Sequence, residues 1–192
     1  TVDWVRKATG IDIDKGLAAG GFLDGSVVVA GTFTDTITFA HDTANETTLA
    51  AETMLERDAF VAKYDSNGNF EWVRHAQGID DDEATAVATI AGGSFVVAGT
   101  FTTTITLGVG EANQTTLAAP FEFDRNIFVA RYDANGRLQA AARVPGIGAA
   151  HDTGVVPGGD VLVAGWLAGG ATLRDVTGAA IPVSAAGGID AF

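Results

Sequence analysis

The sequence contains no cysteine and few basic residues. The absence of cysteine excludes disulfide bonds and thiolate metal sites. The 11 Lys and Arg residues stand against 24 Asp and Glu residues, which gives a formal net charge of −13. A strongly negative chain repels the phosphates of nucleic acids and of anionic membrane surfaces. We therefore expect no nucleic-acid partner, and an acidic protein without cysteine is compatible with export from a bacterial cell.

Long apolar runs are absent as well. No window approaches the ~18 consecutive apolar residues that a membrane-spanning helix needs, and no basic segment is followed by an apolar one as in a secretory signal. We therefore expect no membrane insertion. The chain begins with Thr1 rather than Met, inside a repeat. This start favours a processed or truncated product whose targeting signal lies upstream.

The sequence is rich in glycine and in apolar residues, with 25 Gly among 192 residues and a hydrophobic content of 47%. That length and content suffice for a sizeable core in one domain or one run of repeats. Thr, Ala and Val are abundant and helix-forming charged stretches are scattered, which favours many short strands joined by tight turns. The predicted fold class is all-β.

An internal repeat with a period of 68 residues is the strongest signal in the chain. The stretch Val28 to Thr34 returns as Val96 to Thr102, and Asp58 to Asp65 returns as Asn126 to Asp133. A fixed period over two separate apolar segments indicates that one supersecondary unit is repeated and stacked. A repeat scaffold carries many functions, so the period predicts the architecture and leaves the biochemical role open.

The second repeat shows the first two strands of the unit most clearly. Residues 84–90 alternate small apolar side chains with Thr and Val, which is the period-two pattern of a strand. Residues 95–107 form a second alternating segment that would be ~40 Å long if straight, which is long for one strand. We expect a bend or bulge at Gly99, repeated at Gly31 and Gly165.

Two further strands complete the unit. Residues 127–132 and 137–143 alternate on either side of Asp133-Ala134-Asn135-Gly136, and Asn-Gly between two such runs predicts a hairpin because both residues tolerate positive φ. A polar insertion precedes this hairpin at residues 108–125 and matches residues 40–57 of the first repeat. The insertion has no clear period, and a hairpin is one interpretation of it.

The period divides the whole chain, as a single array, into four pieces. Asp3 to Arg6 matches Glu71 to Arg74, so the chain opens on a fourth strand, and Asp190 to Phe192 matches the start of a third strand. The last unit is degenerate, as terminal repeats commonly are. The approximate units are 1–14 (a lone fourth strand), 15–82 (repeat 1), 83–150 (repeat 2) and 151–192 (an incomplete repeat 3).

The unit resembles the bacterial β-propeller repeat known as SBBP. The residues that carry the resemblance are Asp58 to Trp72, Val96 to Phe101, Asn126 to Gly136 and Gly188 to Phe192. The resemblance implies propeller blades in exported, often cell-surface or multidomain bacterial proteins, and offers no established catalytic residues. The insertion of ~20 residues departs from the pattern, because it lifts the period above the ~40 to 50 residues of ordinary blades.

Four-stranded blades in this number predict an incomplete ring. The chain supplies about three blades, whereas propellers close with ~4 to 8. Two alternatives remain open at this point. The chain is a fragment of a longer propeller, or two copies associate into a six-bladed ring in which the open edges pair.

The loops between the fourth strand of one unit and the first strand of the next carry clustered carboxylates. Alternating carboxylates could supply oxygen ligands to Ca²⁺, although solvated loop carboxylates are the ordinary interpretation on an acidic protein. The third unit has Gly146 to Ala150 at this place, which argues against a metal common to all units. The candidate Ca²⁺ ligands are Asp12, Asp14, Asp80, Asp82 and Glu83.

Histidine and tryptophan give weaker signals. His41, His75 and His151 could act as bases or metal ligands, but they occupy non-equivalent positions and no nucleophile-and-base spacing accompanies them. Trp4 and Trp72 could stack on sugars. In-register aromatic residues in repeats are, however, more typical of packing between units.

These observations favour a non-enzymatic, exported structural or adhesive scaffold that contacts a protein partner or a second copy. The insertions 40–57 and 108–125 are the expected contact surfaces, because loops carry recognition on rigid repeats. The alternative is a carbohydrate- or Ca²⁺-binding module, with no other cofactor, and a hydrolase is a third and weaker one. The expected location is extracellular or at the cell surface, or else periplasmic.

Overall fold

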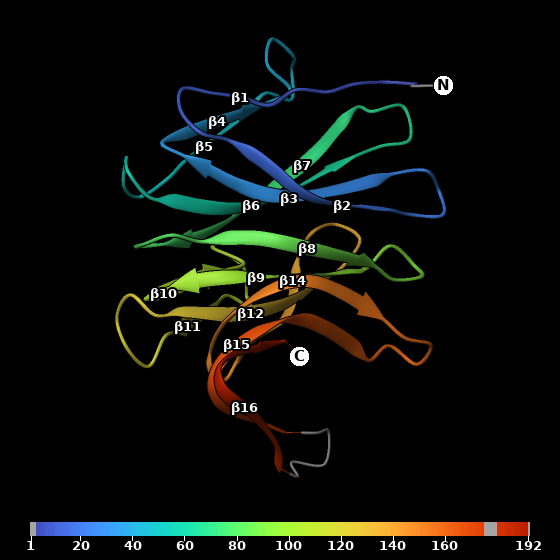
Figure 1. Cartoon of the computed structure of the whole chain (residues 1–192). Coiled ribbons are helices and arrows are strands. Elements are labelled where there is room, and N and C mark those ends of the chain that lie inside the picture. The colour runs from blue at the N-terminus through green and yellow to red at the C-terminus, as the bar shows by residue number, and fades with distance from the viewer. Residues whose placement is uncertain (1–2, 175–179, 192) are drawn as a thin grey trace.

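The structure, a computed structural model, describes residues 3–174 and 180–191 (Figure 1). Every regular element in these ranges is a β-strand, and paired strands run antiparallel, so the all-β prediction is confirmed. Within the same ranges there is no helix long and apolar enough to span a membrane. Three sheets lie one above another (Figure 1).

The first sheet contains the four strands of repeat 1 in sequence order. Each strand pairs with the next one along the chain, because short turns connect them. The Asn-Gly turn after β6 closes with a hydrogen bond from Gly68 N to Asp65 O, as the sequence predicts. The strands are β2 (Lys15–Gly21), β3 (Val27–Thr34), β6 (Arg57–Tyr64) and β7 (Phe70–Gly78).

The second and third sheets repeat this order. The second contains β8 (Glu83–Thr89), β9 (Phe95–Thr102), β12 (Arg125–Tyr132) and β13 (Leu138–Val144). The third contains β14 (Ile147–Val155), β15 (Val161–Arg174) and β16 (Ala180–Ala191). Asp190 pairs with Leu167 as Asp58 pairs with Phe33, so the chain ends on the start of a third strand, as predicted. Phe192 and residues 175–179 lie outside the described residues.

Short strands extend the sheets at one end. β4 (Thr36–Phe39) pairs with β5 (Thr47–Ala50), and β10 (Thr104–Leu107) pairs with β11 (Thr115–Ala118), so each insertion begins as a hairpin. β10 also pairs with the end of β7, which joins the second repeat to the first sheet.

The N-terminal segment follows the same plan incompletely. β1 (Thr9–Gly10) pairs with β4 as the end of β7 pairs with β10. Residues 3–8 form no regular strand, contrary to the expectation of a full fourth strand. The reason is that β7 pairs with β6 along most of its length, whereas no described strand pairs with residues 3–8.

The expected break in the long second strand lies four residues later than predicted. β9 ends at Thr102 and β10 begins at Thr104, with Thr103 at a φ of 57°, and Asp35 has a φ of 59° at the equivalent place. A left-handed residue interrupts the ladder because it turns the following carbonyl away from the pairing direction. The prediction of a bend at Gly99 is therefore wrong in its position.

Gly99 marks a bulge instead. The register of β8 against β9 shifts between Ala84 and Ala86, directly opposite Gly99, and the same shift occurs opposite Gly31 and Gly165. The bulge brings the carbonyl oxygen of Glu83 onto the Cα of Gly99, so that a Cβ would overlap it and the Phe128 ring. Glycine recurs at this position because the bulged strand leaves no room for a side chain.

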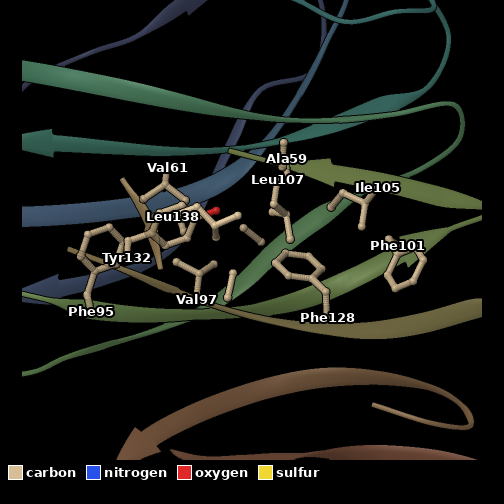
Figure 2. Close-up of a cluster of buried hydrophobic side chains, with 14 of the residues drawn as sticks. Ala59, Val61, Phe95, Val97, Phe101, Ile105, Leu107, Phe128, Tyr132 and Leu138 are labelled. Atoms are coloured by element: carbon tan, nitrogen blue, oxygen red, sulfur yellow. The ribbon is translucent and has the colours of Figure 1, made fainter. Parts of the chain in front are cut away.

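The main core lies between the first and second sheets (Figure 2). The second sheet contributes large side chains such as Phe95, Phe101 and Phe128, and the first contributes small ones such as Ala59 and Val61. Large and small residues on facing sheets interdigitate without voids, which favours a fixed stacking distance. Smaller clusters lie between the second and third sheets and beneath the N-terminal segment.

The first strands of the three units lie side by side, β2 next to β8 and β8 next to β14 (Figure 1). Threonine hydroxyls of β8 donate hydrogen bonds to both neighbours, from Thr89 to Gly21 O at 2.9 Å and from Thr85 to Ala150 O at 2.7 Å. These bonds join adjacent sheets at their first strands.

Candidate functional site

The predicted carboxylates lie in two equivalent loops, Gly10-Ile11-Asp12-Ile13-Asp14 between β1 and β2, and Gly78-Ile79-Asp80-Asp81-Asp82 between β7 and β8. In both loops the last carboxylate folds back over the first glycine, where a Cβ would overlap it. Glycine at the first position is thus required by the packing of aspartate at the fifth.

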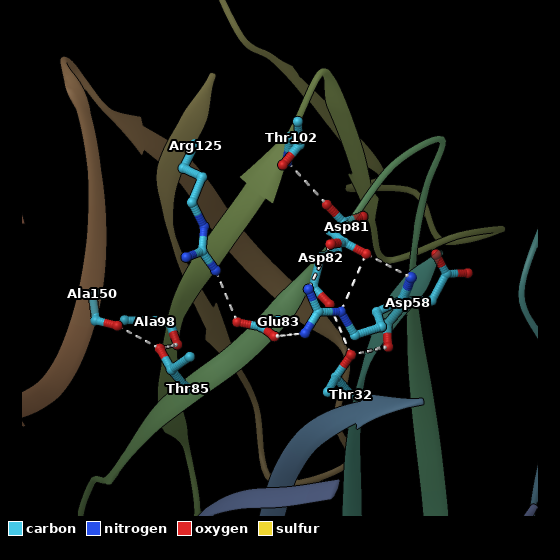
Figure 3. A network of polar contacts seen from close by, with 11 residues as sticks. Thr32, Asp58, Asp81, Asp82, Glu83, Thr85, Ala98, Thr102, Arg125 and Ala150 are labelled. Atoms are coloured by element: carbon cyan, nitrogen blue, oxygen red, sulfur yellow. Dashed lines mark hydrogen bonds and ion pairs between the residues drawn. The ribbon is translucent and has the colours of Figure 1, made fainter. Parts of the chain in front are cut away.

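Asp82 is buried in the interface between the first and second sheets. Its Oδ1 accepts a hydrogen bond of 3.4 Å from Thr102 N, and its Oδ2 has no hydrogen-bond partner among the described residues. Its main-chain carbonyl accepts from Thr32 Oγ1 at 3.0 Å (Figure 3). Burial, together with the nearby carboxylate of Asp58, raises the pKa of Asp82 to about 10.

Asp58, on β6, faces the same interface and pairs with His75 on β7. The Nε2 atom of His75 lies 2.6 Å from Asp58 Oδ2, and both side chains are largely buried. In the second repeat the pair becomes Asn126 and Arg143, whose atoms Oδ1 and Nη1 are 3.2 Å apart. A polar pair at this position is therefore part of the repeat, and only its chemistry changes.

Glu83 is engaged in ion pairs rather than free for a metal. Its carboxylate contacts Arg57 at 2.7 Å and Arg125 at 3.0 Å (Figure 3). Asp81, which the sequence analysis did not select, contacts Arg57 as well, and the Arg57 guanidinium lowers the pKa of Asp81. A charged network thus connects β6, β8 and β12 around the loop.

The first loop lacks these partners. Asp12 is exposed. Asp14 is half-buried, and its Oδ1 has no hydrogen-bond partner among the described residues. Partial burial raises the pKa of Asp14. Asp14 is the counterpart of Asp82, but the described chain has no sheet that covers it as the first sheet covers Asp82.

The five candidate ligands do not converge. Within residues 3–174, the one group of three His, Asp or Glu ligand atoms that lie within 4.8 Å of each other is His41, Asp42 and Glu46, all exposed. Ca²⁺ takes six to eight oxygen ligands, so the loops would have to rearrange or add main-chain and water ligands to hold it. Calcium binding at Asp12, Asp14, Asp80, Asp82 and Glu83 stays a prediction.

The third unit has a shorter loop than the alignment at 68 residues suggests. Ala84 and Ala150 occupy equivalent register positions, an offset of 66, whereas Ala76 and Val144 keep the offset of 68. Two residues are therefore missing between β13 and β14, and Gly148 takes the place of Asp82. The buried carboxyl is specific to the loop between repeats 1 and 2.

The tryptophans take part in contacts between units. The Trp72 ring lies over Gly136, in the turn after β12, where a Cβ would overlap it, and Trp4 lies over Gly68 in the same way. Arg74 lies 5.0 Å from the centroid of the Trp72 ring. We call this arrangement of Trp, Arg and turn the Trp-Arg contact. Packing between units is thus the role of these aromatic residues, as the sequence favoured.

Arginine fixes the Trp-Arg contact by hydrogen bonds. Arg74 Nε donates to Gly136 O at 2.8 Å and Arg74 Nη2 donates to Asn135 O at 2.8 Å. Arg6 makes the same bonds to Gly68 O at 2.6 Å and to Asn67 O at 3.3 Å. The signal in the sequence was the spacing Trp-x-Arg, present at both positions with the period of the repeat.

A cavity of about 760 Å³ lies beside the first Trp-Arg contact, between the N-terminal segment and the loop after β4. Its wall includes Arg6, Thr43, Tyr64 and Phe70. Of the other histidines, His41 is exposed on the rim of this cavity and His151 is exposed on β14.

Comparison with protein-family models found no match to the chain, and comparison with curated proteins found none either.

Proposed function

We propose that the chain is a non-enzymatic, exported scaffold of β-propeller repeats that acts by binding other proteins, including a second copy of itself. The observation that carries the proposal is an accumulation of exposed apolar side chains at one end of the sheets. We call this the insertion end. It comprises residues 11–13, 51–56, 79–81 and 119–124.

Equivalent positions of both insertions present large apolar groups to solvent. The exposed fraction of Leu55 is 92% and that of its counterpart Phe123 is 75%. Met54 and Phe121 beside them are also exposed. Apolar groups gathered on one exposed face are typical of an interaction site. A rigid repeat that carries such groups on its insertions fits a protein-binding scaffold.

The opposite end of the sheets differs. Its tight turns, at residues 22–26, 65–69, 90–94 and 133–137, are polar except for Leu23, which is fully exposed. Leu23 therefore offers a matched control, because it has the same chemistry as Leu55 on the other side of the same sheet.

The order of strands supports the propeller part of the proposal. Each sheet is an antiparallel meander, and the first strands of successive sheets lie side by side, as the inner strands of blades do. Further units or a second copy would then complete the ring. The proposed location, outside the bacterial cell, at its surface or in the periplasm, rests on the resemblance to SBBP repeats.

Homotypic adhesion of protein-coated beads tests the proposal. We expect wild-type beads to aggregate, the double variant L55S/F123S to aggregate much less, and L23S to behave as wild type. Sedimentation equilibrium on the same three proteins should show self-association that only the double variant loses. Dispersed wild-type beads together with a monomer at all concentrations would refute the proposal, as would equal aggregation of all three proteins.

A ligand-binding module is the second candidate. The partnerless carboxylate oxygens of Asp14 and Asp82 favour its calcium version. The carbohydrate version cannot use the Trp4 and Trp72 rings freely, because they pack on turn glycines. Hydrolase activity has the weakest support, since His75 is bound to Asp58 inside the sheet interface.

A further inference from the structure

The corner beside the Trp-Arg contact occurs twice in the structure, with one difference. In the second repeat, Glu111 directs its carboxylate into the corner. Its Oε2 accepts a hydrogen bond of 2.7 Å from Leu138 N, and its Oε1 lies 3.7 Å from Arg74 Nε. A carboxylate thus satisfies a main-chain N–H group and faces a guanidinium group at the same time.

The first repeat keeps the frame of this corner. Arg6 takes the place of Arg74 and is held by equivalent bonds to the turn carbonyls of Gly68 and Asn67. Phe70 takes the place of Leu138 at the start of its strand, in the same register against β6 as Leu138 against β12.

The carboxylate itself is missing from the first repeat. Thr43 stands where the second repeat has Glu111, and its hydroxyl donates to Ala40 O at 2.7 Å. The cavity of about 760 Å³ lies at this place, and Thr43, Arg6 and Phe70 form part of its wall. Among the described residues no side chain accepts a hydrogen bond from Phe70 N.

The charge of the cavity wall suits an anion. The wall contains Arg6, Lys7 and His41 and, among the described residues, no Asp or Glu. This is unusual in a chain with a net charge of −13. The nearest acidic residues on the same loop make other contacts: Asp42 pairs with His41 at 2.9 Å, and Glu46 accepts from Asp42 N at 2.8 Å.

We propose that this cavity binds a small organic carboxylate in the position that Glu111 occupies in the second repeat. The carboxylate accepts a hydrogen bond from Phe70 N and faces Arg6, and the body of the ligand contacts the exposed edges of Tyr64 and Phe70. A charge-assisted pair of this kind is stronger than a neutral hydrogen bond. The site goes beyond the scaffold role and does not depend on ring closure or on the insertion end.

Two sources share this chemistry, an acidic sugar and an acidic amino acid. Isothermal titration and NMR shift mapping with D-glucuronate and with N-acetylglutamate distinguish them, with D-glucose as the neutral control. We expect one site per chain with a Kd of about 0.1 to 10 mM, since a small ligand in an open cavity makes few contacts. The tighter of the two acids identifies the source, and glucose should not bind.

Exchange of the two side chains provides matched variants. Thr43→Glu supplies the internal carboxylate, so we expect carboxylate binding to weaken by about tenfold or more, with the melting temperature unchanged or raised. Glu111→Thr opens the second corner, so we expect two sites instead of one. Three outcomes would overturn the proposal: no carboxylate binding to the wild type, equal binding of glucose, or unchanged binding and stoichiometry in both variants. If T43E does not fold, the stoichiometry of E111T still decides.

Discussion

Arg74 Nε donates a hydrogen bond of 2.8 Å to the carbonyl oxygen of Gly136, 62 residues further along the chain. The bond connects β7 of the first sheet to the turn of the second sheet. Arg6 makes the equivalent bond to Gly68. In the second sheet the positions of Trp72 and Arg74 are taken by Ala140 and Ala142, so β13 has no side chains with which to form the contact again.

Removal of the Trp-Arg contact should loosen the stacking of the first two sheets. We expect Arg74→Ala to lower the free energy of unfolding by about 1 to 2 kcal/mol. Trp72→Ala should lower it by about 2 to 4 kcal/mol, because it also removes packing area. Urea unfolding measures both effects. Arg137→Ala is the control, since its exposed guanidinium makes no hydrogen bond within the described residues, and a loss as large as that of R74A would contradict the assigned role.

The buried carboxyl of Asp82 should make stability depend on pH. Its pKa is about 10 in the folded protein but about 4 in an unfolded chain. Between these values the folded state holds a proton that the unfolded state has lost. The free energy of unfolding therefore falls as pH rises, by up to about 1.4 kcal/mol per pH unit for this group.

Asp82→Asn removes this dependence, because an amide cannot ionise. We expect D82N to be more stable than the wild type near pH 8 and the difference to shrink toward pH 5. Denaturant unfolding at several pH values measures the difference. Asp14→Asn is the matched control, since Asp14 is only half-buried and should give a smaller effect of the same sign. A pH-independent difference for D82N would show that the carboxyl is ionised in the folded protein.

Gly99 should tolerate no side chain. A Cβ at this position would overlap the carbonyl oxygen of Glu83 and the ring of Phe128. We expect Gly99→Ala to destabilise the protein by about 2 to 3 kcal/mol, as measured by chemical unfolding. Gly154→Ala is the control, because nothing lies within 4 Å of its Cβ position, and it should be neutral or slightly stabilising. Equal effects would mean that the bulge does not crowd Gly99.

Calcium binding would show as heat on titration and as a rise in melting temperature. If the loops hold the ion, the double variant D80N/D82N should lose the response to Ca²⁺, and D12N/D14N should lose a second, weaker one. Because Asp82 would have to release its proton, binding should strengthen as pH rises. An absence of heat and of any thermal shift with excess Ca²⁺ would remove the calcium hypothesis.

The four-strand pattern could be predicted because its signals are local. Alternation in residues 84–90 and the Asn-Gly turns depend on neighbours in the sequence. The break at Thr103 could not be predicted, since Thr has no preference for positive φ and Gly99 offered a more obvious position. The missing residues between β13 and β14 became visible only from the pairing registers of Ala84 and Ala150.

The site was less accessible than the fold. Asp80, Asp82 and Glu83 look alike in the sequence, yet Asp82 is buried and Glu83 faces two arginines. The difference arises from Asp58 and Arg125, which reach the loop only when the sheets stack. The absence of a carboxylate beside Arg6 likewise has meaning only when the two repeats are superposed.

Electron microscopy of the protein at concentrations where it self-associates is the most direct test of the scaffold proposal. The account predicts closed rings of about four to eight blades, with the insertion ends on one face and two copies contributing where no further repeats are present. Open, non-closing stacks of sheets, or particles of a single three-sheet chain at every concentration, would contradict it.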